Sequence, residues 1–522
     1  MKNIGNIISA SLRHPKPEGA TFSYGTAGFR MQADFLDSVV YRVGLSAALR
    51  SRKLNGQTVG VMITASHNPA PDNGIKLVDP QGGMLEKSWE TYVTSLANAE
   101  TDEELQKEIE KIVKVTKIDM QGGMNVIYAR DTRPSGEVLA QTLKDALDAI
   151  GATSTDHGVK TTPQLHYLVR ALNTVGTVSP YGEPTESGYY QKLSIAFRKL
   201  LKEKPRGSTV YVDCANGVGG PKLRELKKYL GEECLDLVIT QDDCGADFVK
   251  TFQKPPPGTK LTPLQRHASL DGDADRIIYY YAGQDGSFRL LDGDKIAGLA
   301  AMFFQDLVKS AGIDLKIGIV QTAYANGNST NYLTKTLKLP VTCVATGVKH
   351  LHHAAQRYDI GIYFEANGHG TVLFSPTALA LLETHEASSP AQHSALESLR
   401  GLSNLINQTV GDALSDLLLV EAILASKGWG PSEWDSAYTD LPNRLFKKVV
   451  KDQSLFVTTD AERKLVKPEG LQEKIDELVA KYSDGRAFVR ASGTEDLVRI
   501  YAEAKTRSEA DDLGMRIMAL VS

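Results

Sequence analysis

Short runs of β-branched and apolar residues alternate along this chain with segments that carry apolar residues at helical spacing. The runs cover residues 59–64, 125–130, 209–214, 317–322, 341–346 and 360–364, and a Gly-, Asp- or Asn-containing turn follows each of them. Since strands that are separated by helices can pair in parallel, this alternation predicts βα units and mixed or parallel sheets. We therefore expect an α/β protein.

The last part of the chain has a different pattern. Apolar residues recur at helical spacing within 470–482 and alternate within 497–505, which predicts a helix packed on a small antiparallel sheet. The 522 residues are too many for one hydrophobic core. From clusters of Pro and Gly we expect α/β domains over 1–178, 179–291 and 292–430, and a smaller α+β domain over 431–522.

The composition excludes several classes of protein. A chain with 42% hydrophobic and 23% charged residues is neither disordered nor fibrous. The 59 Lys and Arg against 63 Asp and Glu leave no excess of positive charge for nucleic acid. We expect no signal peptide and no membrane span, because the N-terminus is polar and long apolar runs are absent. Four cysteines without CxxC spacing fit a reducing compartment, so a cytoplasmic location is expected.

Three aspartates at alternate positions, Asp271, Asp273 and Asp275, are followed by Arg276. Alternate residues face one side of an extended chain, so an extended turn brings the three carboxylates together. Such carboxylates repel one another unless a cation lies between them, and oxygen ligands favour a hard ion such as Mg²⁺. An EF-hand is excluded, because its sixth and twelfth positions need Gly and Glu but are Arg276 and Ala282 here. A solvated acidic turn is the alternative.

The strand predicted over 59–63 leads into Thr64-Ala-Ser-His-Asn-Pro. Regular structure cannot continue past Pro69, so Ser66 lies on a turn at the carboxyl end of the strand, where open α/β sheets place active sites. A Ser beside a His suggests an acyl-transfer nucleophile, but no Gly-x-Ser-x-Gly elbow surrounds it. A turn with purely local hydrogen bonds is the alternative.

A third motif, Arg490-Ala-Ser-Gly-Thr494, is accompanied by Arg499. Gly493 permits a tight turn with exposed backbone N–H groups, and Ser492 and Thr494 add hydroxyl donors. Two arginines supply charge-assisted bidentate bonds. This combination predicts a phosphate-binding loop, against the alternative of a surface loop with incidental arginines.

A fourth motif, Phe364-Glu-Ala-Asn-Gly-His-Gly370, follows the strand predicted over 360–364. Glu365 and Asn367 are separated by one residue, so both face the same side and can hold adjacent sugar hydroxyls. The segment Lys349-His-Leu-His-His353 is interpreted as the start of a partly exposed helix, since its spacing does not favour a metal site.

Together the four motifs resemble those of the α-D-phosphohexomutase superfamily, in the family's order and along nearly the whole chain. Further similar segments are Tyr24-Gly-Thr-Ala-Gly-Phe-Arg30, Gln321-Thr-Ala-Tyr-Ala-Asn-Gly327 and Thr346-Gly-Val-Lys-His350. The resemblance implies three related mixed-sheet α/β domains and a smaller C-terminal α+β domain around a central cleft. Many members have Ser at the position of Asn367, and the Asn resembles the eukaryotic branch that acts on acetylglucosamine phosphates.

The resemblance also implies a role for each motif. Ser66 is expected to be a phosphoserine, and Asp271, Asp273 and Asp275 are expected to hold Mg²⁺ together with a phosphoryl oxygen on Ser66. Glu365 and Asn367 would orient the sugar, and Arg30 and Arg276 would stabilise charge near the transferring group. The non-reacting phosphate would be held by Arg490, Ser492, Gly493, Thr494 and Arg499.

The implied reaction interconverts N-acetylglucosamine 6-phosphate and 1-phosphate through a sugar 1,6-bisphosphate and supplies UDP-N-acetylglucosamine synthesis. Its general base is expected to be Lys76, in the same loop as Ser66; a phosphate-binding role for Lys76 and a base role for His67 are the alternatives. The other functions left open are phosphoglucomutase, phosphomannomutase, a phosphatase and a sugar-phosphate-binding protein. The expected partner is a small-molecule sugar phosphate, without an obligate protein partner.

Overall fold

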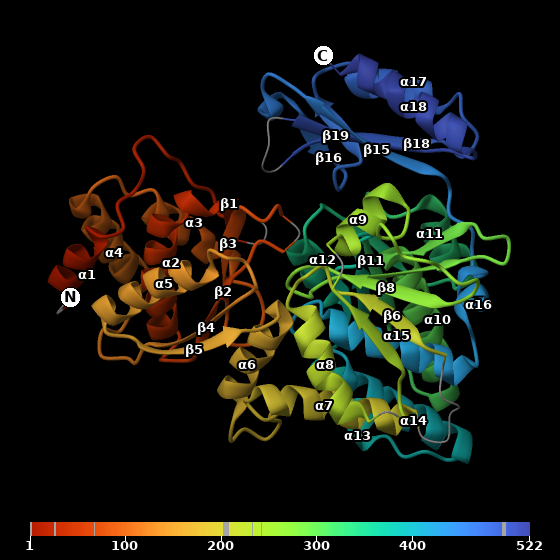
Figure 1. Ribbon diagram of the computed structural model, residues 1–522, viewed down its shortest axis with the longest axis horizontal. Coiled ribbons are helices and arrows are strands. Elements are labelled where there is room, and N and C mark those ends of the chain that lie inside the picture. The colour runs from red at the N-terminus through yellow and green to blue at the C-terminus, as the bar shows by residue number, and fades with distance from the viewer. Residues whose placement is uncertain are drawn as a thin grey trace.

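The structure is a computed structural model that describes residues 3–25, 28–66, 68–201, 208–231, 233–241, 243–492 and 497–521. Within these ranges the chain forms three sheets of mixed strand direction, one antiparallel sheet and a small hairpin. Figure 1 shows three bodies: an N-terminal one, a larger one that contains the second and third sheets, and a C-terminal one above it.

The first sheet has the strand order β1-β3-β2-β4-β5. Its strands are β1 (Phe29–Gln32), β2 (Val59–Ile63), β3 (Asp72–Val78), β4 (Asn125–Arg130) and β5 (Thr153–Val159). The helices of this part are α1 (Ile4–Ser11), α2 (Asp37–Lys53), α3 (Lys87–Ala97), α4 (Asp102–Thr116), α5 (Gly136–Ile150) and α6 (Thr162–Thr174). Helix α4 illustrates how the local sequence sets a helix. The Thr101 side chain caps its first turn, and Leu105, Ile109 and Ile112 form its buried face.

The second sheet has the order β10-β9-β8-β6-β7 and the third the order β12-β11-β13-β14. The strands are β6 (Val210–Asp213), β7 (Leu237–Thr240), β8 (Arg266–Leu270), β9 (Ile277–Ala282), β10 (Phe288–Leu291), β11 (Ile317–Thr322), β12 (Val341–Val344), β13 (Ile360–Phe364) and β14 (Gly370–Phe374). The accompanying helices are α7 (Glu186–Leu200), α8 (Gly219–Leu230), α9 (Gly245–Phe252), α10 (Gly293–Ala311), α11 (Gly327–Asn331), α12 (Val348–Ala355), α13 (Pro376–Thr384), α14 (Pro390–Leu405), α15 (Ala413–Lys427) and α16 (Pro431–Asp435). One continuous apolar core joins the two sheets.

The three mixed sheets share one feature that positions the site. In each of them a strand with a parallel neighbour is followed by an antiparallel partner: β2 by β3, β8 by β9 and β13 by β14. The three connecting turns contain Ser66, the aspartates 271–275, and Glu365 with Asn367. The expected set of three related mixed-sheet units is thereby confirmed, and each unit carries one motif at the corresponding turn.

The C-terminal sheet is antiparallel, with the order β15-β19-β18. Its elements are β15 (Asn443–Val449), β18 (Arg486–Ala491), β19 (Leu497–Glu503), α17 (Leu471–Val479) and α18 (Arg507–Leu520), beside the hairpin of β16 (Val457–Thr459) and β17 (Lys464–Lys467). Ile475 of α17 and Leu513 of α18 pack with Val498 and Ile500 of β19 in a separate core. The predicted helix on a small antiparallel sheet is confirmed.

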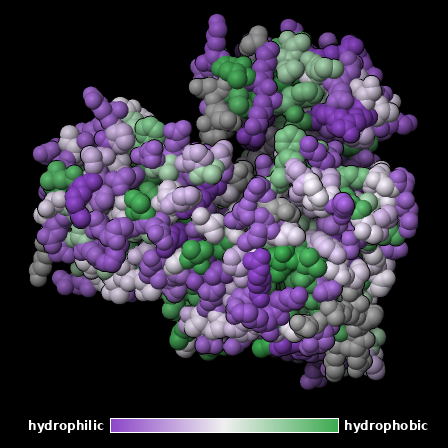
Figure 2. Space-filling model, viewed as in Figure 1, coloured by the Kyte–Doolittle hydropathy of each residue, from purple (hydrophilic) through white to green (hydrophobic). Residues whose placement is uncertain are grey.

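Four predicted strands, over 59–63, 125–130, 317–322 and 360–364, coincide with β2, β4, β11 and β13, while β6 and β12 are shorter than expected. The exact domain limits remain predictions. Among the described residues, no helix has the length and apolar character that crossing a bilayer would need. The face shown in Figure 2 is mainly hydrophilic with scattered hydrophobic residues, and its outline is notched between the N-terminal and C-terminal bodies.

Candidate active site

A cleft of about 1770 Å³ lies where the bodies meet. It is lined by residues from all four main sheets or the turns beside their strands: Arg30, Lys76, Asp275, Arg276, Glu365, Asn367, Arg490, Ser492 and Arg499. The structure therefore brings most of the predicted site residues together, although they are spread over more than 450 positions of sequence. His67, Gly493 and Thr494 lie outside the described residues.

Ser66 lies directly against the aspartate cluster. Its hydroxyl donates to Asp271 Oδ2 at 2.5 Å, and the residue is 4% exposed. Its φ of 52° is in the left-handed region, which costs a non-glycine residue about 1 kcal/mol or more. The turn keeps this conformation partly because the Ser66 N–H donates to Thr64 Oγ1 at 3.1 Å. A strained serine aimed at a charged cluster has the placement of a reacting group.

Arg133 holds this turn, and the sequence analysis did not identify it. Its guanidinium donates to the carbonyl oxygens of Ser66, Asn68, Pro69 and Asp72 at 2.7–3.0 Å. Asp131 Oδ2 accepts from Arg133 Nε at 3.2 Å and fixes the arginine in turn. The available signal was the segment Arg130-Asp-Thr-Arg-Pro134 directly after a predicted strand, since a turn at the same sheet edge needs donors for its free carbonyl groups.

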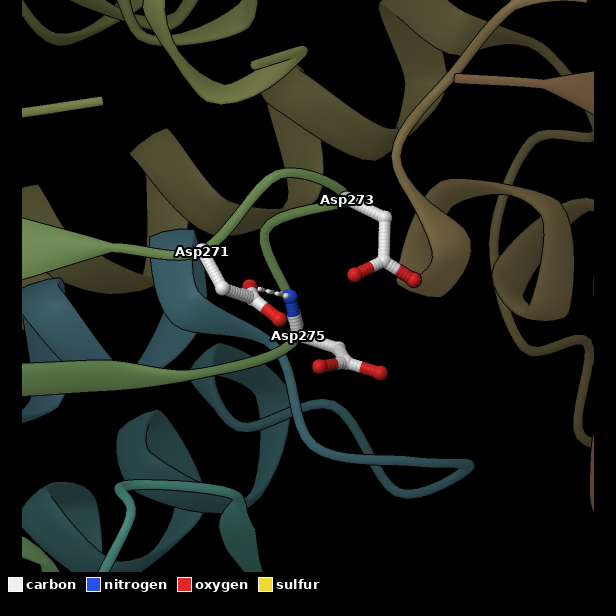
Figure 3. A group of neighbouring side chains, drawn as sticks. All are labelled: Asp271, Asp273 and Asp275. Atoms are coloured by element: carbon white, nitrogen blue, oxygen red, sulfur yellow. Dashed lines mark hydrogen bonds between the residues drawn. The ribbon is translucent and has the colours of Figure 1, made fainter. Parts of the chain in front are cut away.

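The three aspartates converge as predicted (Figure 3). Asp271, Asp273 and Asp275 each offer a carboxylate oxygen within 4.8 Å of the others, and all three are buried. The turn closes through Ala274 at φ 56°, while the N–H groups of Asp275 and Arg276 donate to Asp271 Oδ1 at 3.1 and 3.2 Å. Backbone donors thus fix one carboxylate, and the others are oriented around it.

The electrostatics of the cluster fit a divalent cation. Burial and the neighbouring charges of Asp275 and Asp273 raise the pKa of Asp271 well above its usual range. Within the described part of the chain, Asp273 Oδ1 and Asp275 Oδ1 are buried without a hydrogen-bond partner. An all-oxygen donor set with unsatisfied buried atoms and mutual repulsion is what Mg²⁺ satisfies. These residues therefore fit the ion that the sequence predicted.

Cationic side chains surround the cluster. Lys76 Nζ lies 3.5 Å from Asp273 Oδ2 and 3.7 Å from Asp275 Oδ2, and Arg276 Nε lies 3.7 Å from Asp271 Oδ2. Burial raises the pKa of Asp275, but the positive charges of His369, Lys76 and Arg276 lower it by more. The pKa of Asp275 is therefore below its usual value. The expectation that Lys76 lies in the Ser66 loop is wrong: it belongs to β3, opposite Met62 of β2, because the chain reverses before Asp72.

The motif predicted to bind the sugar is fixed to the aspartate turn through backbone contacts. Ile277 N–H donates to the carbonyl of Gly368 at 3.2 Å, and Arg276 and His369 form an isolated bridge. Gly368 has φ 88°, and a Cβ there would come within 2.0 Å of the Ile277 carbonyl oxygen, so glycine is required. Asn367 Oδ1 accepts from His369 N–H at 3.0 Å, which leaves its amide N–H groups as the donors at the cleft.

The arginines predicted to bind phosphate come from neighbouring strands. Arg490 of β18 lies directly opposite Arg499 of β19, and the Ser492 N–H donates to the Leu497 carbonyl at 2.8 Å. Directly opposite residues of an antiparallel pair have their side chains close together, and like charges there repel. An anion between the two guanidinium groups relieves that repulsion, so the pair is suited to a phosphate monoester.

Three family models match the chain. "Phosphoglucomutase/phosphomannomutase, alpha/beta/alpha domain I" matches residues 43–104 and 98–180, and "Phosphoacetylglucosamine mutase AMG1, domain III" matches residues 292–429. "Phosphoglucomutase/phosphomannomutase, C-terminal domain" matches residues 448–520. These models describe separate parts of one architecture, in the order in which their motifs occur here.

Full-length relatives agree with these models. The phosphoacetylglucosamine mutase of Homo sapiens is 49% identical, with 99% of this chain and 97% of the relative covered. A crystal structure of Aspergillus fumigatus N-acetylphosphoglucosamine mutase in complex with GlcNAc-6P and magnesium has 57% identity and a TM-score of 0.95 over 99% of this chain and 98% of that one. A serine-to-alanine variant of the same enzyme in complex with glucose 1,6-bisphosphate reaches a TM-score of 0.97, with the same identity and coverage. The chain belongs to the phosphoacetylglucosamine mutase family of the α-D-phosphohexomutase superfamily.

Proposed function

We propose that this chain interconverts N-acetylglucosamine 6-phosphate and N-acetylglucosamine 1-phosphate through a phosphoserine at Ser66. The observation that carries the proposal is the contact of Ser66 Oγ with Asp271, in the turn whose Asp275 and Arg276 line the same cleft as Arg490 and Arg499. The serine hydroxyl beside this turn is suited to phosphoryl transfer, and the two arginines are suited to binding a phosphate that does not react. The family supports this reading.

In the first half of the reaction, the free hydroxyl of the bound sugar monophosphate attacks phosphorus on Ser66. A bond forms between the sugar oxygen and phosphorus, the bond between Ser66 Oγ and phosphorus breaks, and the hydroxyl proton passes to a base. The products are a sugar 1,6-bisphosphate and the Ser66 hydroxyl, because the base passes the proton to the leaving Oγ. Arg30 and Arg276 line the cleft and stabilise the charge on the transferring group.

In the second half, the bisphosphate turns over and Ser66 Oγ attacks its other phosphorus. The bond between that phosphorus and the sugar oxygen breaks, and the sugar oxygen takes up the proton. Arg490, Arg499 and Ser492 hold the non-reacting phosphate in both halves, and Gly493 and Thr494 are proposed to join them. Glu365 and the amide N–H groups of Asn367 orient the sugar between the two ends.

Asp271, Asp273 and Asp275 are proposed to hold Mg²⁺. A bound Mg²⁺ neutralises phosphoryl charge in such a site. Lys76 is proposed as the general base, and its contacts with Asp273 and Asp275 equally suit it to bind the transferring phosphoryl group. The pH dependence of the Lys76→Ala variant distinguishes these roles: loss of the acid-side limb identifies a base, and a raised KM with an unchanged profile identifies a ligand.

We also propose that the reaction feeds UDP-N-acetylglucosamine synthesis, that the enzyme works in the cytoplasm, and that it needs no obligate protein or nucleic acid partner. The cysteine usage supports the cytoplasmic location, and the balanced charge supports the absence of a nucleic acid partner.

The Ser66→Ala variant tests the proposal. We expect turnover of N-acetylglucosamine 6-phosphate to fall by about three orders of magnitude or more, because the covalent nucleophile is lost. Ser88→Ala, at an exposed serine, is the matched control and should keep full activity. Near-normal turnover by Ser66→Ala would contradict the mechanism. Release of inorganic phosphate at the rate of substrate loss would instead identify a phosphatase.

A further inference from the structure

The segment 322–327, which the sequence analysis singled out without assigning a role, is where the C-terminal body docks on the third sheet. Arg486 of β18 donates to the carbonyl oxygens of Ala323 and Ala325 at 2.8 and 2.5 Å. The Gly327 N–H donates to Glu503 Oε1 at 3.1 Å. These contacts place the segment directly beneath the strands that carry the phosphate-binding arginines.

Tyr324 projects from this segment to Arg490. Its hydroxyl accepts from Arg490 Nε at 2.9 Å, and the guanidinium carbon lies 5.3 Å from the centre of its ring. The ring of Tyr324 is itself held by edge-to-face contacts with Phe488 at 5.0 Å and Tyr501 at 5.9 Å. Two aromatic side chains of the C-terminal body therefore hold the Tyr324 ring, and with it the hydroxyl, in place.

A second edge of the Arg490 guanidinium is also held. Glu462 Oε1 lies 3.7 Å from Arg490 Nη1, while Glu462 Oε2 accepts from the Thr346 N–H at 2.9 Å. Thr346 belongs to the third unit and lines the cleft. Nε and Nη1 are thus engaged, and the Nη2 donors of Arg490 have no acceptor among the described residues.

We propose that Tyr324 is a positioning residue for Arg490, which fixes the guanidinium so that its Nη2 edge meets the non-reacting phosphate of the sugar phosphate. The inference rests on the phosphate-binding role proposed above for Arg490. Arginine loses considerable side-chain freedom when it binds an anion, so prior immobilisation strengthens binding. Because Tyr324 belongs to the third unit, Arg490 is fully oriented only while the C-terminal body is docked.

Binding of N-acetylglucosamine 6-phosphate, measured by calorimetry with Mg²⁺ present, tests this inference. The measurements use the full chain with Ser66→Ala, so that no turnover occurs. We expect Tyr324→Phe to raise Kd about three- to tenfold, because it removes one hydrogen bond to a charged group and keeps the ring. Tyr358→Phe is the control, since it removes a hydroxyl that bonds to Thr342 in the same unit, away from Arg490.

A double-mutant cycle with Arg490→Ala separates positioning from general loosening of the docked body. If Tyr324 acts through Arg490, its substitution has no further effect once Arg490→Ala is present. If Tyr324→Phe weakens binding equally in both backgrounds, the hydroxyl supports docking of the whole body and the inference is overturned. An unchanged Kd for Tyr324→Phe alone also overturns it. An unchanged Kd for Arg490→Ala would overturn the proposed phosphate-binding role of Arg490 and, with it, this inference.

Discussion

Two sides of the cleft are built differently. The transfer side carries Ser66 and the three aspartates, where phosphoryl transfer is proposed, and the gripping side carries Arg490 and Arg499, which are proposed to bind phosphate. On the transfer side, backbone contacts join the turns of different units, including the bond from Ile277 to Gly368 and the bond from Thr162 to the Asp273 carbonyl. A Cβ at Gly272 would come within 2.8 Å of the Ser66 carbonyl oxygen, so the serine and metal turns also touch. On the gripping side, the arginines belong to a body with its own apolar core.

The gripping side is fastened mainly by side chains. The side chains of Arg486, Glu503 and Asn326 are among those that form hydrogen bonds at this junction, for example from Asn326 Nδ2 to the Leu441 carbonyl at 2.9 Å. Contacts of this kind can break and re-form without disturbing a core. The reaction needs this difference, because phosphoryl transfer requires fixed geometry while the bisphosphate has to turn over between two transfers.

After Ser66→Ala, the largest effect is expected from Asp273→Asn, on the transfer side. Asp273 is fully buried and central in the cluster, so we expect the affinity for Mg²⁺ to fall at least about tenfold and activity about a hundredfold. The fold should persist, because removing one charge relieves repulsion. Titration of activity with Mg²⁺ checks this, with Asp148→Asn on the exposed surface of α5 as the control. An unchanged Mg²⁺ requirement would show that the metal site is misassigned.

On the gripping side, Arg486→Ala should loosen the docked body. We expect KM to rise about tenfold, because several hydrogen bonds across the junction are lost, while the Mg²⁺ dependence stays unchanged. Small-angle scattering should report a more extended average shape. Arg516→Ala is the control, since Arg516 pairs with Asp512 on the exposed surface of the same body. If Mg²⁺ affinity changed together with KM, the two sides would not be independent.

Between the two sides, Asn367→Ser should change substrate choice by a few-fold. The Asn367 amide N–H groups are the donors at the cleft, and they suit the acetamido carbonyl or the hydroxyl beside it. Rates with N-acetylglucosamine 6-phosphate and glucose 6-phosphate, measured side by side, should show a preference for the first that the variant narrows. Faster use of glucose 6-phosphate by the unmodified enzyme would favour a phosphoglucomutase.

The smallest effect concerns the pH dependence of stability and tests the packing of β8, the strand that leads into the aspartate turn on the transfer side. Burial lowers the pKa of His267 from 6.5 to about 4, so between these pH values the unfolded chain binds a proton that the folded chain does not. The stability that neutral, buried His267 contributes is fully present above pH 6.5 and is lost as the pH falls towards 4. His267→Phe should reduce the pH slope of the free energy of unfolding by at most about 1.4 kcal/mol per pH unit. His393→Phe, at an exposed site, should leave the slope unchanged.

Much of the fold could be predicted from the sequence, because the parallel strands are short β-branched runs with buried faces. The strands predicted over 59–63 and 317–322 match β2 and β11 to the residue, although the run at β2 extends to residue 64. The antiparallel partners were harder to predict. β3 has a polar start, Asp72-Asn-Gly, and only its pairing with β2 and β1 makes it a strand, so Lys76 was assigned to a loop. Pairing across a sheet is non-local and leaves little trace in one segment.

The site could be predicted where one local segment carries the chemistry. The three aspartates could be predicted as a cluster, and so could the pair Glu365 and Asn367. In each set the residues are two apart, and that spacing predicts side chains on the same side of the chain. Arg133 and Tyr324 were missed, because their roles depend on contacts with turns far away in the sequence. Residues that hold a reacting group in place carry no chemical signature of their own, and only the assembled structure reveals them.

Transfer of an isotopic label tests the central claim most directly. The enzyme, carrying unlabelled phosphate on Ser66, is mixed with N-acetylglucosamine 6-phosphate whose phosphoryl oxygens are ¹⁸O, and Ser66 is then examined by mass spectrometry. The account predicts that labelled phosphate appears on Ser66 and unlabelled phosphate on the sugar, at rates that match turnover. Formation of fully labelled 1-phosphate while Ser66 stays unlabelled would contradict the phosphoserine mechanism.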